Sequence, residues 1–231
     1  MKYYIIAGEA SGDLHASNLM KALLVEDPNA TFRFWGGDKM QAVGGTLVKH
    51  YKELAFMGFW EVFINLFTIL KNISFCKKNI VDFNPDAIIY VDYPGFNLRI
   101  AAWAKKQGFK NLYYISPQIW AWKENRIAKI KRDLDALYVI LPFEKSYYKD
   151  KHNFEVQFVG NPLVDVVQES LKENDTFRAD QKLDANESII ALLPGSRKQE
   201  IIKMMPTFIA VIEGFPQYKF IIAAAPGIDF Q

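Results

Sequence analysis

The stretch YYIIAGEASGD (residues 3–13) is an apolar run that passes at once into a turn with two glycines. The run itself, YYIIA (residues 3–7), does not alternate with polar residues, which is typical of strands buried on both faces of a parallel sheet. Gly8 and Gly12 permit a tight backbone turn, and the polar residues beside them favour the start of a helix near Asp13. A strand joined to a helix in this way is the repeating unit of an α/β fold.

The same unit recurs along the chain. Further short apolar runs predict strands at 32–35, 87–91, 112–115, 137–141 and 156–159. Stretches with helical patterning separate them, at 13–25, 39–43, 61–83, 96–107 and 124–132. This alternation predicts a doubly wound parallel sheet, which we assign to a first, Rossmann-like domain over residues 1–165.

The composition changes after Gly160. Residues 165–187 are polar and charged and read as a linker with a short helix, and two more strands are expected at 189–193 and 219–224. We therefore place a second α/β domain at 166–231. Two strands cannot bury a core of useful size, so this domain is expected to be incomplete, and a small cap docked on the first domain is the alternative.

Bulk composition narrows the functional classes. The 231 residues are 50% hydrophobic with a net charge of +2, which is ordinary for a globular protein and gives no support for nucleic-acid binding. The lone Cys76 excludes an intrachain disulfide and a cysteine metal cluster, and indicates a reducing compartment. The apolar start is too short for a signal peptide, and no run reaches the ~18 residues of a membrane span, so a cytoplasmic location is expected.

A carboxylate follows the strand at 87–91, in the segment DYPGFN (residues 92–97). Parallel sheets bind ligands at the carboxyl ends of their strands, which places Asp92 to act as a general base toward a substrate hydroxyl. The alternative is that Asp92 caps the next helix. Asn97 either caps that helix as well or hydrogen-bonds a sugar.

The next strand leads into SPQIWAW (residues 116–122), in which Trp120 and Trp122 suit stacking on a sugar face or, alternatively, simple filling of the core. A basic stripe follows, which would meet phosphate or an anionic surface, or else form a solvated helix face. Its members are Lys123, Arg126, Lys129, Lys131 and Arg132.

Two glycine turns precede helices. The first, GEASGD (residues 8–13), offers backbone amides to a ligand or is a purely structural turn, and it matches neither the dinucleotide nor the Walker A pattern. The second, LPGSRKQE (residues 193–200), places Arg197 beside a helix start, where it suits a diphosphate. His15, in the first helix, is expected to be a satisfied helix histidine, and the alternative is that it is a ligand.

The segment from Met57 to Cys76 is apolar around most of a helical circumference. A surface helix needs only about a 100° apolar arc to face its core, so the excess is expected to contact lipid, acyl chains or another subunit. The alternative is burial on two sides. The residues predicted to contact membrane or acyl chains are Trp60, Phe63, Phe67 and Leu70.

Seven strings together resemble the lipid-A-disaccharide synthase family in content, order and spacing, over nearly the whole chain. They are GEASGD (8–13), MGFWEV (57–62), DYPGFN (92–97), SPQIWAW (116–122), LPFEK (141–145), GNP (160–162) and LPGSRKQE (193–200). The third departs from the common form D-A-P-D-F-N, because Gly95 replaces its second acidic residue. Asp92 is thus the only carboxylate in this motif.

The resemblance implies a GT-B glycosyltransferase of two domains. It would join UDP-2,3-diacylglucosamine, the donor, to 2,3-diacylglucosamine 1-phosphate, the acceptor, through a β-1,6 bond with inversion and release of UDP. Asp92 would deprotonate the acceptor 6-hydroxyl, and neither a metal nor another cofactor is expected. Such an enzyme would work in a Gram-negative bacterium as a peripheral protein on the inner face of the inner membrane, and its oligomeric state is left open.

The resemblance also implies the residues that contact substrate. They are Gly8, Glu9, Ser11, Gly12, Asp13, Met57, Gly58, Asn97, Ser116, Gln118, Trp120, Trp122 and Arg197. A later uridine-diphosphate motif of the form S-G-T-A-x-L-E is implied as well, and the 231 residues do not contain it. By itself the chain is therefore expected to bind donor weakly and to be inactive.

Two other functions compete with this interpretation. One is a GT-B epimerase acting on a UDP-sugar, which would have no use for the broad apolar helix. The other is a non-catalytic module that binds lipid or membrane.

Overall fold

The computed structural model describes residues 1–54, 66–173, 176–184, 186–196 and 198–224. The chain forms two compact units, Met1–Pro162 (unit 1) and Leu163–Gln231 (unit 2). The division falls shortly before the boundary predicted after residue 165.

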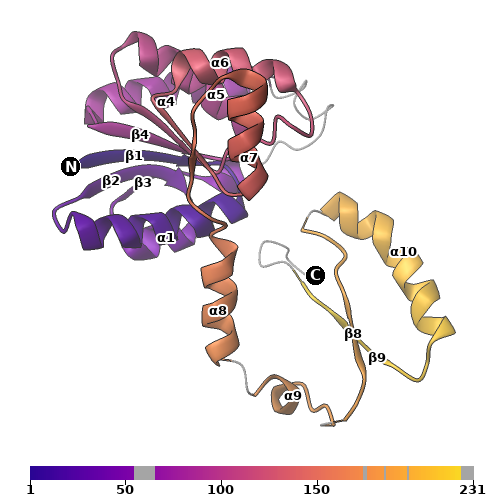
Figure 1. Ribbon diagram of the computed structural model, residues 1–231. Helices are drawn as coiled ribbons and strands as arrows, with labels where there is room; N and C mark the ends of the chain where they lie inside the picture. Colours follow the sequence, from indigo (N-terminus) through magenta and orange to yellow (C-terminus); the bar gives the residue numbers. More distant parts are fainter. Residues whose placement is uncertain (55–65, 174–175, 185, 197, 225–231) are drawn as a thin grey trace. The chain divides into compact units, whose positions relative to one another are not determined.

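Unit 1 is built on a seven-stranded sheet in which every neighbouring pair of strands is parallel (Figure 1). Its strands are β1 (Lys2–Ala7), β2 (Thr31–Gly36), β3 (Thr46–His50), β4 (Ala87–Val91), β5 (Asn111–Tyr114), β6 (Ala136–Val139) and β7 (Gln157–Phe158). They lie in the order β3-β2-β1-β4-β5-β6-β7. The chain thus builds outward from β1 in one direction, returns to the middle and builds outward from β4 in the other, which makes a doubly wound sheet with its switch point between β1 and β4.

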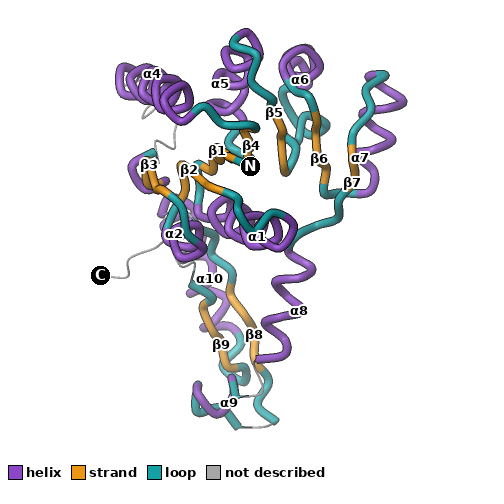
Figure 2. The backbone as a smooth tube through the Cα atoms, turned by 90° about the vertical axis from the view of Figure 1, so that its left-hand side faces the viewer, coloured by secondary structure: helices purple, strands orange, loops and turns teal. Residues whose placement is uncertain are grey.

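Helices cover both faces of this sheet. They are α1 (Ala10–Glu26), α2 (Asp38–Val43), α4 (Leu66–Phe83), α5 (Pro94–Lys106), α6 (Ile127–Asp133) and α7 (Pro142–Ser146), with short turns η1 (Tyr51–Glu53), η2 (Glu124–Arg126) and η3 (Tyr147–Lys151). Figures 1 and 2 show α1 and α2 on one face and α4, α5 and α6 on the other. Neighbouring β1 residues serve the two faces in turn: Ile5 joins the core under α1, and Ile6 joins the core under α4 and α5.

The structure confirms the α/β fold class and corrects details of the expected elements. The edge strand β3 was not predicted, because its residues are only half-buried and include Lys49 and His50. The first helix begins at Ala10, before the predicted start at Asp13, and Glu9 stands at its N-cap position. Helix α7 and turn η3 were also missed.

Unit 2 contains a parallel pair of strands, β8 (Ile189–Leu192) and β9 (Lys219–Ile222), joined through helix α10 (Lys198–Gly214) (Figure 2). Helices α8 (Leu163–Glu173) and α9 (Phe177–Asp180) precede them. The segment read as a linker with a short helix therefore carries two helices. A search of the described residues finds no helix with the length and apolar character needed to span a bilayer.

Candidate active site

Three loops meet at one edge of the sheet in unit 1, where β1, β4 and β5 end. Strand β4 hydrogen-bonds to β1 on one side and to β5 on the other, and all three run in the same direction. Asp92 follows β4, the glycine turn at 8–13 follows β1, and the tryptophan loop at 115–123 follows β5. These segments lie around the switch point, where open parallel sheets bind their ligands.

Asp92 is half-buried and stands on an unusual backbone. Its φ of +45° and the φ of +50° at Tyr93 both lie in the left-handed region, which costs a residue with a side chain about 1–3 kcal/mol. Two buried side chains hold this conformation by donating to the Asp92 carbonyl oxygen, namely Asn97 Nδ2 at 2.7 Å and the Tyr113 hydroxyl at 2.6 Å. The backbone of Asp92 is therefore held in place by two side chains of the core.

Asn97 is itself wholly buried, with no exposed surface. Its Nδ2 atom also approaches the carbonyl oxygens of Ile6 at 3.3 Å and Val91 at 3.5 Å. Asn97 was predicted to contact a sugar, and in the structure it has a role within the fold. Its amide instead ties the ends of β1 and β4 together and anchors the Asp92 carbonyl.

The two glycines of the first turn are explained by packing. A Cβ atom on Gly8 would lie 2.4 Å from the Tyr93 ring, and one on Gly12 would lie 3.2 Å from the Ala7 Cβ. Both residues are buried. Gly8 therefore allows the residue after Asp92 to lie against the end of β1, which a larger residue would prevent.

Asp13 was predicted to contact substrate, and in the structure its carboxylate serves the fold. Its side chain is 3% exposed and accepts three backbone amides, from Gly37 at 2.7 Å, Lys39 at 3.1 Å and Met40 at 3.1 Å. Asp13 thus caps the start of α2 from α1. In the same turn, Ser11 is exposed and Glu9 is half-buried.

His15 lies one turn into α1, on the side of Asp92. Burial lowers the pKa of its imidazole below the ordinary value, and the Asp92 carboxylate acts on this pKa in the opposite direction. Its Nδ1 atom is buried and has no hydrogen-bond partner within the described part of the chain. The expectation of a satisfied helix histidine is therefore wrong, and the imidazole lies within electrostatic range of Asp92.

The tryptophan loop is anchored by residues other than its tryptophans. Ser116, which was predicted to contact substrate, is 4% exposed, and its hydroxyl lies 2.8 Å from the Tyr148 hydroxyl. Ile119, at 1% exposure, fills the core. Trp120 and Trp122 are 38% and 57% exposed, which excludes the reading that they simply fill the core.

Glu144 holds the indole of Trp120. This carboxylate is 1% exposed and accepts the backbone amides of Leu141 at 2.9 Å and Ile140 at 3.2 Å, and Trp120 Nε1 at 3.3 Å. Phe143 packs edge-on against the same indole, with ring centroids 5.0 Å apart. Glu144 was not predicted as a positioning residue, although an acid at the third position of a helix that begins with Pro142 is the acidic half of a capping box.

The remaining predicted residues are distributed as follows. Gln118 is exposed at the surface of the tryptophan loop. Phe67 and Leu70 on α4 are 87% and 51% exposed, so neither is buried on two sides. Met57, Gly58, Trp60, Phe63 and Arg197 lie outside the described residues.

The glycine turn of unit 2 has an acidic side chain in contact with it. Gly195 has a φ of +108°, and the Ser196 amide donates to the Glu200 carboxylate at 3.1 Å. The φ of Gly195 lies in the left-handed region that favours glycine, and a Cβ atom there would also lie 2.5 Å from that carboxylate.

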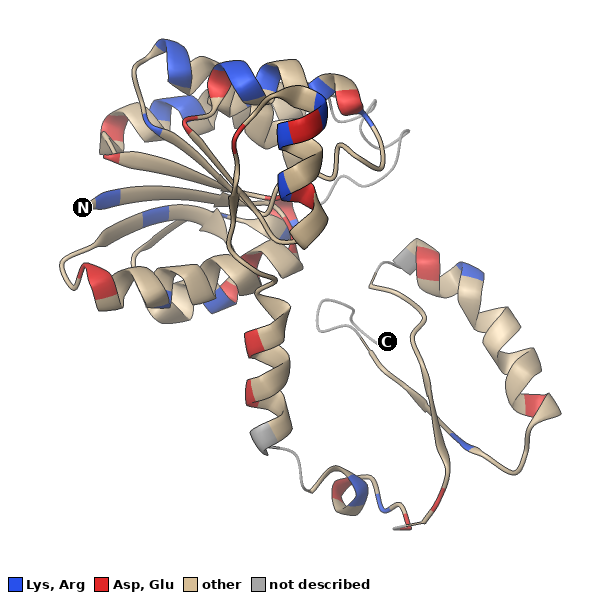
Figure 3. Ribbon diagram, in the orientation of Figure 1, with Lys and Arg blue, Asp and Glu red and all other residues tan. Residues whose placement is uncertain are grey.

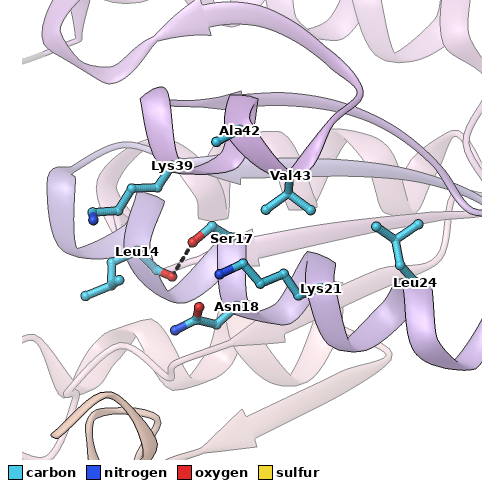
Figure 4. Close-up of a pocket in the computed structure, with 8 residues that line it drawn as sticks. All are labelled: Leu14, Ser17, Asn18, Lys21, Leu24, Lys39, Ala42 and Val43. Atoms are coloured by element: carbon cyan, nitrogen blue, oxygen red, sulfur yellow. Dashed lines mark hydrogen bonds between the residues drawn. The ribbon is translucent and has the colours of Figure 1, made fainter. Parts of the chain in front are cut away.

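A surface cavity of about 480 Å³ lies apart from the predicted residues, between α1 and α2 (Figure 4). It is lined by Leu14, Ser17, Asn18, Lys21, Leu24, Lys39, Ala42 and Val43. Within it the Ser17 hydroxyl donates to the Leu14 carbonyl oxygen at 2.8 Å, so this hydroxyl is engaged by its own helix. Among the described residues, no group of three or more His, Cys, Asp or Glu side chains has the arrangement of a metal site.

A family model described as lipid-A-disaccharide synthetase matches residues 3–222. The chain belongs to this family. The resemblance inferred from the seven strings is thereby confirmed.

Curated relatives agree with this membership. Lipid-A-disaccharide synthase from Geobacter metallireducens is 40% identical over 228 residues, which cover 97% of this chain and 59% of the relative. The synthase from Trichlorobacter lovleyi is 39% identical over 226 residues, which cover 98% of this chain and 57% of the relative. The chain thus spans less than two thirds of the length of these relatives.

Solved structures share the fold at low identity. UDP-GlcNAc 2-epimerase from Neisseria meningitidis, bound to UDP-GlcNAc, superposes with a TM-score of 0.70 at 12% identity, over 98% of this chain and 67% of that one. The glycotransferase of kitacinnamycin superposes with a TM-score of 0.60 at 13% identity, over 100% of this chain and 67% of that one. These likenesses confirm the GT-B-like fold and say nothing about the reaction.

Proposed function

We propose that this chain is part of an inverting glycosyltransferase that joins UDP-2,3-diacylglucosamine to 2,3-diacylglucosamine 1-phosphate, forming the lipid A disaccharide 1-phosphate and UDP. Membership of the lipid-A-disaccharide synthase family supports the substrates. The observation that carries the proposal is the placement of Asp92 at the switch point, on a backbone held by Asn97 and Tyr113.

In the proposed reaction the Asp92 carboxylate accepts the proton of the acceptor 6-hydroxyl. The oxygen forms a bond to C1 of the donor sugar from the face opposite UDP, and the bond from C1 to the phosphate oxygen breaks. UDP leaves with that electron pair, which inverts C1. A base fixed before substrate arrives loses little orientational freedom at this step.

The remaining assignments concern binding. Glu9, Ser11 and Gln118 are the polar predicted residues of unit 1 that reach the surface beside Asp92, and we assign them to the acceptor. Trp120 and Trp122 offer aromatic faces to its sugar ring. We assign Met57 and Gly58 to the same site, and Arg197 to the donor diphosphate.

The test is a product assay on the full-length protein with both substrates. We expect a disaccharide 1-phosphate and one UDP per disaccharide, and no reaction when the acceptor is left out. Conversion of the UDP-sugar to its 2-epimer without acceptor would instead establish the epimerase function. Binding of acylated sugars without any turnover would favour the non-catalytic module.

We further propose that the protein acts as a peripheral protein at the inner face of the inner membrane, through helix α4. Phe67 and Leu70 present exposed apolar side chains on this helix, and Lys71, Lys77 and Lys78 follow on it. An apolar face with cations beside it favours binding to an anionic bilayer surface. We assign Trp60 and Phe63 to the same contact.

Flotation with anionic liposomes tests this proposal. We expect the double variant Phe67→Ser, Leu70→Ser to stay folded and to lose most of its liposome binding, because about 0.8 kcal/mol is lost per apolar CH₂ withdrawn from lipid. Val25→Ser is the matched control, since Val25 is a 78% exposed apolar residue on α1. Equal flotation of the double variant and the control would exclude α4 as the contact.

A further inference from the structure

The loop after β5 carries a cluster of one aromatic ring and two cations. The indole of Trp122 is 57% exposed. Lys123 Nζ lies 4.4 Å from its ring centroid, and the guanidinium carbon of Arg126 lies 5.1 Å from the same centroid. Both distances are within the range of a cation–π contact, so both positive charges lie close to this ring.

The backbone of this loop brings the two cations together. Lys123 has a φ of +57°, in the left-handed region, and its carbonyl oxygen accepts the Arg126 amide at 3.0 Å. This tight turn forms η2 and leads directly into α6. The cluster of Trp122, Lys123 and Arg126 is thus set by the chain trace as well as by the side chains.

Glu124, which lies between Lys123 and Arg126 in the sequence, bonds to other residues. Glu124 forms an ion pair with Lys151 at 2.7 Å, accepts the Tyr147 hydroxyl at 3.0 Å, and lies 3.1 Å from His152 Nε2. These contacts direct its charge toward η3. No ion pair found among the described residues includes Lys123 or Arg126.

Other members of the basic stripe are used within the fold. Arg132 pairs with Asp133 at 2.7 Å, and Lys131 Nζ donates to the His152 carbonyl oxygen at 2.9 Å. Figure 3 shows Lys and Arg positions recurring along α6. Lys123 and Arg126 therefore differ from the rest of the stripe, because their charges converge on an exposed aromatic ring.

The cluster lies near the proposed base. Strands β4 and β5 are neighbours, so Asp92 and the cluster follow strands that end at the same edge. Burial raises the pKa of Tyr113 well above its ordinary value. Two charges also act on this phenol: Asp92 raises its pKa, and Arg126 lowers it. A ligand on the cluster would thus lie at the same edge of the sheet as the carboxylate.

We propose that Trp122, Lys123 and Arg126 form a subsite for a sugar phosphate, in which the indole packs on the sugar ring and the two cations bind the phosphomonoester. This deepens the proposed function, on which it rests, because it assigns the phosphate end of the acceptor. A phosphomonoester carries close to two negative charges at pH 7 and matches two cations in charge. The planar guanidinium offers two parallel N–H donors to phosphate, and sugar rings pack well on an indole face.

A bilayer surface is the competing ligand for these cations. The cluster has a single aromatic ring, whereas α4 carries several exposed apolar residues, including Phe67, Leu70 and Phe75. Stable binding to a bilayer needs buried apolar area together with charge. The cluster therefore suits a soluble head group of defined shape better than it suits a membrane.

The test measures binding of glucosamine 1-phosphate to the full-length protein, with glucosamine and inorganic phosphate as comparison ligands. Arg126→Gln removes one charge, and Lys123→Asn removes the other with a residue that tolerates the left-handed backbone. Lys129→Gln is the matched control, because Lys129 is an exposed lysine of the same stripe. Trp122→Leu tests the aromatic face.

We expect each charge variant to raise the Kd for glucosamine 1-phosphate about tenfold, equal to about 1.4 kcal/mol, and to leave the Kd for glucosamine unchanged. Trp122→Leu should weaken binding of both sugars, and Lys129→Gln should weaken neither. Charge variants that behave like Lys129→Gln would overturn the proposal, as would a wild-type protein that does not bind glucosamine 1-phosphate at millimolar concentration.

A vesicle arm separates the two sources of phosphate. Loss of binding to phosphatidylglycerol vesicles in Arg126→Gln, with glucosamine 1-phosphate binding intact, would overturn the subsite in favour of a membrane contact. The product assay separates the subsite from the proposed function. If the protein makes no disaccharide but binds glucosamine 1-phosphate through these residues, the proposed reaction alone is refuted. If the protein is an active transferase and both charge variants leave the acceptor KM unchanged, the subsite alone is refuted.

Discussion

Polar residues at the carboxyl edge of the sheet fall into two groups. Asn97, Asp13 and Ser116 are buried and bond to the backbone or to core side chains, so they position the loops. Asp92 and Gln118 keep exposed surface at the same edge. At the scale of single residues, only a small number of exposed side chains are therefore available to contact substrate. The buried polar residues fix the positions of the loops that carry them.

His15 should make stability depend on pH. Burial lowers its folded-state pKa below the unfolded value of about 6.5. Below pH 6.5 the unfolded chain therefore binds the proton more readily, and stability falls as the pH drops from the unfolded pKa toward the folded one. We expect wild type to lose more stability than His15→Gln between pH 7.5 and pH 5.5 in urea unfolding. Equal losses in the two proteins would show that the imidazole titrates normally in the fold.

At the scale of elements, the loop after β5 is held by the start of α7. The Glu144 carboxylate joins the two by accepting both backbone amides at that start and the indole N–H of Trp120. The loop residue Ile119 is buried beneath them. The tryptophan loop is thus a preformed surface whose position depends on a buried acid.

Glu144→Gln should release Trp120. The amide oxygen of Gln can still accept the backbone amides of Ile140 and Leu141, but its NH₂ group then faces the indole N–H, donor against donor. We expect the free energy of unfolding to fall by about 1–2 kcal/mol, with a change in near-ultraviolet circular dichroism from Trp120.

The control for this variant is Glu155→Gln. Glu155 is exposed and makes an ion pair with Lys149 at 3.5 Å, which is worth about 0–1 kcal/mol. A loss no greater in Glu144→Gln than in Glu155→Gln would mean that the buried acid does not hold the loop.

Some of these elements were predictable from sequence and others were not, for physical reasons. The strand at 87–91 is uniformly buried, and such a strand shows as an unbroken apolar run. The edge strand β3 has partly exposed residues and gave no such run. The candidate site shows the same limit. Sequence order was enough to place Asp92 after its strand. The burial of Asn97 and Asp13 could not be predicted in this way, because it depends on contacts with Ile6 and Gly37, which are distant in sequence.

At the scale of the whole molecule, the two apolar cores belong to one unit. Every residue of both clusters lies between Tyr3 and Val156, within unit 1. In unit 2, Leu192 and Pro194 are the buried apolar residues among those described. The stability of unit 1 is therefore expected to come from its own sheet and helices.

A fragment that contains Met1–Pro162 alone should fold. We expect it to unfold cooperatively in urea and to keep the near-ultraviolet circular dichroism of its buried tyrosines, because all seven strands of the sheet and both cores are present. A fragment that shows helical far-ultraviolet signal but no fixed tertiary signal would contradict this view of unit 1.

The proposed function combines these scales, since it requires a base at the switch point of unit 1 that deprotonates the acceptor hydroxyl. The most direct measurement is the rate of disaccharide formation by full-length Asp92→Asn, which keeps the shape of the side chain and tolerates the left-handed backbone. Asp86→Asn is the matched control, because Asp86 lies at the opposite end of β4, where it accepts the Lys2 amide at 2.7 Å. We predict that Asp92→Asn lowers kcat by about 10²–10⁴-fold with little change in the acceptor KM, whereas Asp86→Asn keeps nearly the wild-type kcat. A kcat near the wild-type value in Asp92→Asn would contradict the assignment of the base.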